Sequence, residues 1–255
     1  MNYLSSWITI LIHGNNINDM VKHDKEDILY YNKSEVNKCF TITYPHTGSR
    51  LMMKVLDNFS FDSYELKNNK LIYKKSGSQH NHTFDLFEGH EDYKLMISCR
   101  NPYDIFVSKF RFYLGGLRVM KSTFNLKSEF LEFIEEFIFE VEERTWFKSS
   151  HLLKSEKMLL RPIDYRIKLE TLEESYSKVP FIAESEFTKS GLLLEVLNKK
   201  IGDHKELRLV KPWVPHLPKD FRDYYTQETA DLVYSNFKEL FLFMDYDKDS
   251  WKKDL

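Results

Sequence analysis

Cysteine is scarce in this chain. Cys39 and Cys99 are the only two among 255 residues, so neither a disulfide framework nor a four-cysteine metal site can form. Both lie in apolar runs, and we interpret them as buried structural thiols. Asp85, Glu88 and His90 imitate a metal cluster, but a charged surface loop is the better interpretation. We therefore expect no metal and a cytoplasmic location.

Long apolar runs are missing as well. A membrane-spanning helix needs about 20 mostly apolar residues, and the opening run Trp7–Ile12 is much shorter. This run also lacks a basic leader and a small-residue cleavage site, so we expect it to form an edge strand or a packed arm. The 37 basic and 39 acidic side chains almost cancel, which argues against a general polyanion-binding surface but allows a local basic pocket. We expect neither a membrane nor a nucleic acid as a partner.

The composition is that of a folded protein. Hydrophobic residues make up 42% of the chain, and 20 phenylalanines and 15 tyrosines supply much of the interior. The length is at the upper end of what one core supports. No internal repeat or low-complexity linker divides the sequence. We predict a single α/β domain over residues 1–255, with its core at about 38–246.

The first informative segment runs strand, loop, helix. Residues 38–44 alternate apolar and β-branched side chains, which predicts a strand. A turn with Pro45 and Gly48 follows, and residues 51–59 then place their apolar side chains at helical spacing.

A second segment repeats this order. Residues 93–99 form a largely apolar run, typical of a strand that is buried on both faces of a parallel sheet. Asn101 then occupies the place of a helix N-cap, with Pro102 at the first helical position of a helix that continues through Phe112. Together the two segments predict a central, mostly parallel sheet flanked by helices.

The other predicted elements are simpler. Residues 65–83 are polar, and we interpret them as a surface excursion with at most a short strand at Leu71–Tyr73. Hydrophobic periodicity and capping residues predict four more elements: an amphipathic helix at about 127–148, a strand within 158–169, and helices at 187–199 and at 226–243, the last opened by Thr226.

The loop after the first strand has the composition of a phosphate-binding turn. A glycine lets the backbone approach an anion, and the N-terminus of the following helix offers free N–H groups and a positive dipole end. Thr47, Ser49 and Arg50 add further donors around Gly48. The usual nucleoside triphosphate pattern requires Gly-Lys-Ser/Thr, and that lysine is missing here. A plain N-capping turn is the alternative.

The loop after the second strand adds a cation. Arg100 follows a strand at the carboxyl edge of the expected sheet, where ligands bind in open α/β folds. A capped helix alone explains Asn101 and Pro102 but not an arginine at the strand tip. A guanidinium there is well shaped to bind a phosphate through two hydrogen bonds, and Ser108 lies on an early turn of the helix.

The two loops together resemble those of one enzyme family. Residues 44–49, Tyr-Pro-His-Thr-Gly-Ser, resemble the 5′-phosphosulfate loop of sulfotransferases that use 3′-phosphoadenosine 5′-phosphosulfate (PAPS), which is usually Tyr-Pro-Lys-Ser-Gly-Thr. Residues 100–108 match the family's 3′-phosphate motif, Arg-Asn-Pro-x-Asp-x-x-Val-Ser, at every defined position. More loosely, residues 163–174 resemble the strand and acidic turn of the membrane-bound carbohydrate branch. Residues 224–246 resemble the family's terminal helix and its Phe-Gly-Tyr ending.

The resemblance implies a single sulfotransferase domain with a P-loop-like phosphosulfate-binding loop. The implied cofactor-binding residues are His46, Thr47, Gly48, Ser49, Arg50, Arg100 and Ser108. The implied reaction moves a sulfuryl group from PAPS to a hydroxyl or amine, releases 3′,5′-bisphosphate nucleotide (PAP), and needs no metal. We expect a small-molecule acceptor, such as a specialised metabolite. The alternatives are carbohydrate or protein sulfation, a P-loop-like kinase, and a nucleotide-binding module without catalysis.

The sequence departs from the family at two places. The loop lysine that assists the leaving phosphate is replaced by His46, to which we assign the same catalytic role. The family's C-terminal Arg-Lys-Gly segment is not visible, and its candidate substitutes are Lys205, Arg208 and Lys211.

Family members use a histidine or a glutamate as the base that takes the acceptor's proton. We favour His82, because it lies between the two motifs, in a stretch where the family's base is often found. His80, His90 and a glutamate are the alternatives.

Overall fold

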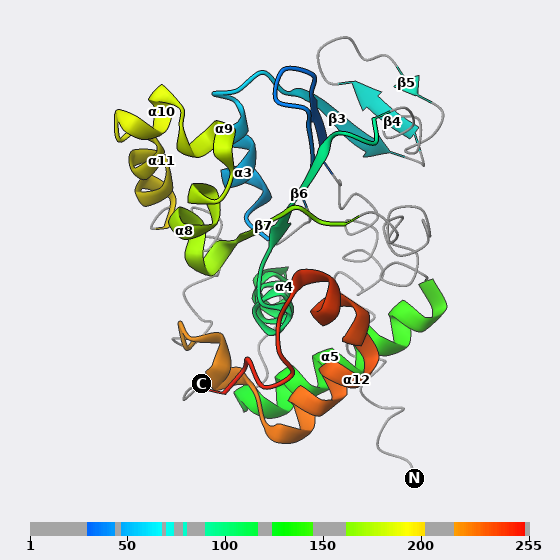
Figure 1. Ribbon diagram of the computed structural model, residues 1–255. Helices are drawn as coiled ribbons and strands as arrows, with labels where there is room; N and C mark the ends of the chain where they lie inside the picture. The colour runs from blue at the N-terminus through cyan, green and yellow to red at the C-terminus, as the bar shows by residue number, and fades with distance from the viewer. Residues whose placement is uncertain are drawn as a thin grey trace. The chain divides into compact units, whose positions relative to one another are not determined.

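The computed structural model describes residues 30–43, 47–67, 70–73, 79–80, 90–116, 124–144, 162–201 and 217–252. The chain divides into two compact units (Figure 1). The sheet unit comprises Ile28–Arg100 and Val141–His204, and the helical unit contains Asn101–Glu140 and Lys205–Leu255. A single domain stays a prediction.

The sheet unit is built on one seven-stranded sheet, in the order β5-β4-β3-β1-β2-β6-β7. Its strands are β1 (Tyr30–Ser34), β2 (Cys39–Thr43), β3 (Asp62–Lys67), β4 (Lys70–Tyr73), β5 (Gln79–His80), β6 (Lys94–Cys99) and β7 (Tyr165–Lys168). The predicted strands at 38–44 and 93–99 correspond to β2 and β6, and β7 lies within the strand predicted at 158–169. With its helices, this sheet gives the α/β arrangement that the sequence predicts.

The expectation of a mostly parallel sheet is wrong. The pairings β2–β6 and β6–β7 are parallel, whereas β1–β2, β1–β3, β3–β4 and β4–β5 are antiparallel. The reason is connection length. Short links such as the one from Ser34 to Cys39 can only return the chain in the opposite direction, while a parallel neighbour needs a long crossover. Among the described strands, parallel pairing is found in β2, β6 and β7, and the first two of these lead into the two motifs.

The interpretation of residues 65–83 as a surface excursion is also wrong in part. The second half of β3 falls in this stretch, together with all of β4 and β5. Tyr64 faces Tyr73 in the β3–β4 register, and Leu66 faces Leu71. Backbone groups make the hydrogen bonds of a sheet, so the many polar side chains of this stretch do not prevent it from pairing.

The helices of the sheet unit pack around a mainly aliphatic core. They are α3 (Ser49–Leu56), the 3-10 turn η2 (Leu169–Thr171), α8 (Leu172–Ser177), α9 (Pro180–Ala183), α10 (Glu186–Lys189) and α11 (Leu192–Ile201). The core cluster joins α3 to the sheet through Met52, Val55, Met96 and Ile167, all nearly inaccessible to solvent. The helix predicted at 187–199 is in fact two, because Gly191 adopts φ 82° between α10 and α11.

The helical unit contains α4 (Pro102–Gly116), η4 (Phe221–Tyr224), α12 (Gln227–Met244) and most of α5 (Leu126–Arg144). The helices predicted from residue 101, at 127–148 and at 226–243 are confirmed over their described residues. Both predicted caps are present: Asn101 Oδ1 accepts from the N–H of Tyr103 at 3.0 Å, and Thr226 Oγ1 accepts from the N–H of Thr229 at 3.2 Å.

The core of the helical unit is aromatic. The ring of Phe106 lies 4.7 Å from that of Phe237, and the ring of Phe130 lies 5.0 Å from that of Tyr225. Tyr103 packs edge to face on Phe241 at 4.8 Å. Rings at these separations and tilts attract one another beyond the burial of their surface.

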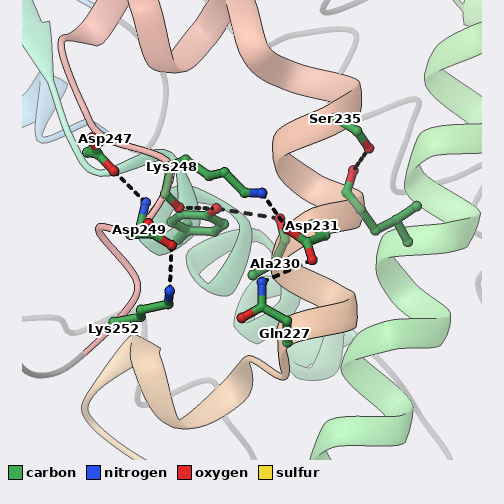
Figure 2. A network of polar contacts seen from close by, with 10 residues as sticks. Gln227, Ala230, Asp231, Ser235, Asp247, Lys248, Asp249 and Lys252 are labelled. Atoms are coloured by element: carbon green, nitrogen blue, oxygen red, sulfur yellow. Dashed lines mark hydrogen bonds and ion pairs between the residues drawn. The ribbon is translucent and has the colours of Figure 1, made fainter.

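The segment after α12 is bonded back to two helices (Figure 2). The carbonyl of Lys248 accepts a hydrogen bond from the Tyr103 hydroxyl of α4 at 2.7 Å, and its ammonium pairs with Asp231 of α12 at 2.9 Å. Asn101 Nδ2 donates to the carbonyl of Ser250 at 3.2 Å. The start of α4 is thus held by backbone carbonyls from the far end of the sequence.

No helix within the described ranges has both the length and the apolar composition to cross a bilayer. The segment Trp7–Ile12, predicted as a strand or an arm, lies outside the described residues.

Candidate functional site

The turn before α3 is shaped by Gly48. Its φ of 82° and ψ of 23° lie in the left-handed region, which glycine adopts without steric cost. Its carbonyl accepts from the N–H groups of Leu51 at 2.9 Å and Met52 at 3.0 Å, which starts the helix. A Cβ on Gly48 would lie 2.8 Å from Cδ1 of Leu169. The backbone conformation therefore favours glycine, and a Cβ would also make the end of the Leu169 side chain shift.

Thr47 ties this turn to the neighbouring strand. Its side chain is buried, and its Oγ1 lies 2.5 Å from Oγ of Ser98, which is buried near the end of β6. The two residues are 51 positions apart in sequence, so the bond fixes the turn against the strand that leads to Arg100. The sequence assigns Thr47 to the cofactor. At least one hydrogen bond of its hydroxyl is instead made inside the protein.

The N-terminus of α3 carries a positive field. Gly48 supplies no side-chain cap, and the first turn of α3 contains no acidic residue. The partial positive charge of the first N–H groups is therefore not offset by a carboxylate in that turn. The backbones of Ser49 and Arg50 form this turn, while their side chains lie outside the described part of the structure.

The strand register brings three strand ends to one edge of the sheet. Ile42 of β2 pairs with Ile97 of β6, and Cys99 of β6 pairs with Lys168 of β7. Because all three strands run in parallel, the Gly48 turn and Arg100 follow the carboxyl ends of β2 and β6, and Lys168 is the last residue of β7. This edge is where ligands bind in open α/β sheets.

The two residues predicted to bind the 3′-phosphate belong to different units. Arg100 is the last residue of the sheet unit and is half-buried. Ser108 lies on the second turn of α4 in the helical unit and is also half-buried. Their joint action on one phosphate stays a prediction.

His90 lies near the amino ends of the parallel strands, opposite the edge that carries the Gly48 turn and Arg100. Its Nε2 is 2.8 Å from Nζ of Lys33, whose strand partner is Phe40 near the start of β2. Its ring packs on Tyr93 with centroids 4.6 Å apart, immediately before β6 begins. At about 3.3 Å per residue, β6 separates this position from Arg100 by roughly 20 Å. This geometry removes His90 from the candidate bases at the carboxyl edge.

His80 lies in the outermost strand, β5. The strands β4, β3 and β1 stand between it and β2. With neighbouring strands about 4.8 Å apart, the backbone of β5 is roughly 19 Å from that of β2. The remaining assigned residues lie outside the described part of the chain: His46, His82, Lys205, Arg208 and Lys211.

Two residues of the site were not found from the sequence. Ser98 is the one hydroxyl residue in the apolar run of β6, and that contrast is the signal that could have marked it. Leu169, which limits the space at Gly48, carries no such signal because a leucine at the end of a strand is ordinary.

The thiols have the predicted structural role. Cys39 and Cys99 are both buried, and neither is part of a disulfide. Burial raises the pKa of the Cys39 thiol to about 12, so the reactive thiolate is not populated near neutral pH. In the described ranges, no group of three or more histidines, cysteines or carboxylates could hold a metal ion. Asp85 and Glu88 lie outside those ranges.

The comparisons with known proteins found no likeness: no family model, no curated protein and no solved structure matches this chain.

Proposed function

We propose that the chain is a sulfotransferase that uses PAPS. In this proposal the Gly48 turn and the N-terminus of α3 bind the 5′-phosphosulfate, and Arg100 and Ser108 bind the 3′-phosphate. The observation that carries it is the bond between Thr47 and Ser98 at 2.5 Å, because it joins the anion-binding type of turn to β6, the strand that leads into Arg100. The resemblance of both loops to the sulfotransferase motifs supplies the chemistry.

The proposed reaction is an in-line displacement at sulfur. The acceptor oxygen or nitrogen forms a bond to sulfur while the bond from sulfur to the phosphate oxygen breaks, and PAP departs. The acceptor's proton passes to a base, for which His82 is the proposed residue. Backbone N–H groups at the start of α3 stabilise the charge that develops on the leaving phosphate. His46 would add a positive charge there when its imidazole is protonated.

Cofactor binding tests the proposal first. PAP should raise the melting temperature more than ATP does, and Arg100→Ala should weaken PAP binding by roughly ten- to a hundredfold, the weight of one charge-assisted contact. Lys38→Ala is the control, because Lys38 pairs with Asp92 at 2.5 Å at the opposite edge of the sheet. If adenosine 5′-phosphosulfate, which lacks the 3′-phosphate, binds as well as PAP, the assignment of Arg100 is wrong.

Transfer of labelled sulfate from PAPS to a panel of hydroxyl and amine acceptors tests the reaction itself. His82→Ala should lower kcat by roughly 10²- to 10⁴-fold and leave PAP binding unchanged. PAP binding without transfer to any acceptor would favour the non-catalytic module. Preferred binding of ATP with Mg²⁺ would favour the kinase, although the loop lacks the lysine that kinases of that type require.

A further inference from the structure

A hollow in the sheet unit begins beside the Gly48 turn. It has a volume of about 610 Å³ and lies between η2, α8 and α11. Leu169 belongs to both places, since it lines the hollow and its Cδ1 stands 2.8 Å from the Cβ position of Gly48. Both α8 and α3 contact α11 (Figure 1). The volume is within the range of about 300–1,000 Å³ that is usual for small-molecule sites.

The hollow is lined by leucines, which we call its floor, and by exposed glutamates, which we call its rim. The four leucines are Leu169, Leu172, Leu194 and Leu197. Leu194 is 41% exposed, which leaves apolar surface open to a ligand. Three carboxylates line the rim: Glu170, Glu173 and Glu174. No lysine, arginine or histidine lines the hollow within the described part of the chain.

The charge of the rim decides which ligand fits. Glu174 pairs with Lys178 at 2.6 Å, and that hydrogen bond holds its pKa below the ordinary value. Glu173 has no ion-pair partner among the described residues, so its charge acts on the hollow directly. A nucleotide with several phosphates would be repelled here, whereas an ammonium group would be attracted. The hollow therefore suits a molecule other than the cofactor.

We propose that this hollow binds the acceptor, and that the acceptor is an aliphatic amino alcohol. This inference rests on the proposed sulfotransferase function. The apolar chain would lie on the leucines, and the ammonium group would lie near Glu173. Neighbouring carboxylates favour the protonated amine, which has no lone pair for attack. The nucleophile is therefore the hydroxyl at the other end, which reaches past Leu169 towards the Gly48 turn. Its oxygen bonds to sulfur as PAP leaves, and its proton passes to the base.

Three probes of equal length test the acceptor class: aminooctanol, octanediol and hydroxyoctanoate, each with its two groups at opposite ends. We expect binding, followed by ligand-observed NMR without PAPS, and sulfation, followed by mass spectrometry with PAPS, to be strongest for aminooctanol and weakest for hydroxyoctanoate. In aminooctanol the sulfate should be found on oxygen. Equal use of the three probes, no use of any, or a sulfated nitrogen would overturn the proposal.

Variants locate the binding. Glu173→Gln should raise KM for aminooctanol about two- to fivefold, the weight of a partly exposed ion pair, and leave KM for octanediol and kcat unchanged. Leu194→Gln should raise KM for both. Glu186→Gln is the matched control, because its side chain is 91% exposed on α10 and lies outside the hollow. An unaltered preference for aminooctanol in Glu173→Gln would overturn the assignment of the rim.

PAP binding distinguishes a failure of the acceptor site from a failure of the proposed function. Normal PAP binding with no response to the probes would leave the proposed function standing and reject the acceptor site. Loss of PAP selectivity in the unmodified protein would reject the proposed function itself.

Discussion

The two units bury their polar groups in different ways. In the sheet unit, buried side chains on the strands bond to one another: Asn32 Nδ2 donates to Thr41 Oγ1 at 2.7 Å, and Thr47 bonds to Ser98 at 2.5 Å. In the helical unit, buried tyrosines bond to backbone carbonyls: the Tyr225 hydroxyl donates to the carbonyl of Tyr103 at 2.9 Å. Neighbouring strands place short hydroxyl side chains within reach of each other, whereas helices are joined by long side chains that reach a distant backbone.

This difference bears on how the two motifs are held. The Gly48 turn is fixed by one hydroxyl pair and one packing contact with Leu169. The start of α4, which carries the second motif, is fixed by an aromatic core and by bonds from Asn101 and Tyr103 to the C-terminal segment. We therefore expect small changes near Gly48 to act sharply, and changes in the helical unit to act through stability.

Alkaline pH should have the largest effect, and it should act in both units. Burial raises the pKa of Tyr103, Tyr224 and Tyr225 in the helical unit above the ordinary value, because the phenolate loses its hydration. Burial does the same to Tyr176 in the sheet unit. The folded state then holds these protons more tightly than the unfolded state does. The stabilisation is complete below about pH 10 and is lost as the pH rises from there towards the folded-state values. Urea unfolding at stepwise pH, with hydrogen exchange pulses, should find that protection falls above about pH 10 in both α4 and α8. A flat stability curve in this range, or a loss of protection in one unit alone, would contradict the prediction.

Substitution of Gly48 should have the next largest effect. Gly48 and Gly191 share a φ of 82°, but a Cβ on Gly191 would meet nothing within 4 Å, whereas one on Gly48 meets Leu169. Gly191→Ala should cost roughly 1–2 kcal/mol of unfolding free energy from the backbone alone. Gly48→Ala should cost slightly more, because the end of the Leu169 side chain has to shift, and should also weaken PAP binding.

The double variant Gly48→Ala with Leu169→Ala provides the control for that crowding. It should recover the steric part of the loss and not the backbone part. Equal effects of Gly48→Ala and Gly191→Ala, measured by chemical denaturation, would show that Leu169 does not restrict the turn.

The smallest expected effect concerns two fully buried tyrosines, one in each unit, that differ in hydrogen bonding. The Tyr103 hydroxyl donates to the carbonyl of Lys248 at 2.7 Å, while the Tyr176 hydroxyl has no hydrogen-bond partner among the described residues. Tyr103→Phe should destabilise by about 1–2 kcal/mol, since it leaves a carbonyl unpaired, whereas Tyr176→Phe should be neutral or stabilise by up to about 1 kcal/mol. Thermal unfolding of both variants measures the difference. Equal losses in the two would mean that the hydroxyl of Tyr176 has a partner after all.

The strands, helix starts and turns that depend on residues close together in the sequence could be predicted from the sequence alone. The strands β2 and β6 follow from runs of apolar and β-branched residues, and the starts of α4 and α12 follow from Asn101 and Thr226, whose side chains cap the helix within three residues. The left-handed turn at Gly48 belongs to the same group, because glycine is the residue that such a backbone requires.

The pairing of strands and the contacts between distant segments became clear only from the tertiary structure. Alternation of side chains marks a strand but not its neighbour or its direction, so the antiparallel pairing of β3, β4 and β5 could not be predicted from their polar sequences. For the same reason, the bond from Thr47 to Ser98 and the position of His90 near the amino ends of the parallel strands could not be predicted. The last two contacts join residues more than 50 positions apart, where the choice among competing partners is made by the packing of the whole sheet unit.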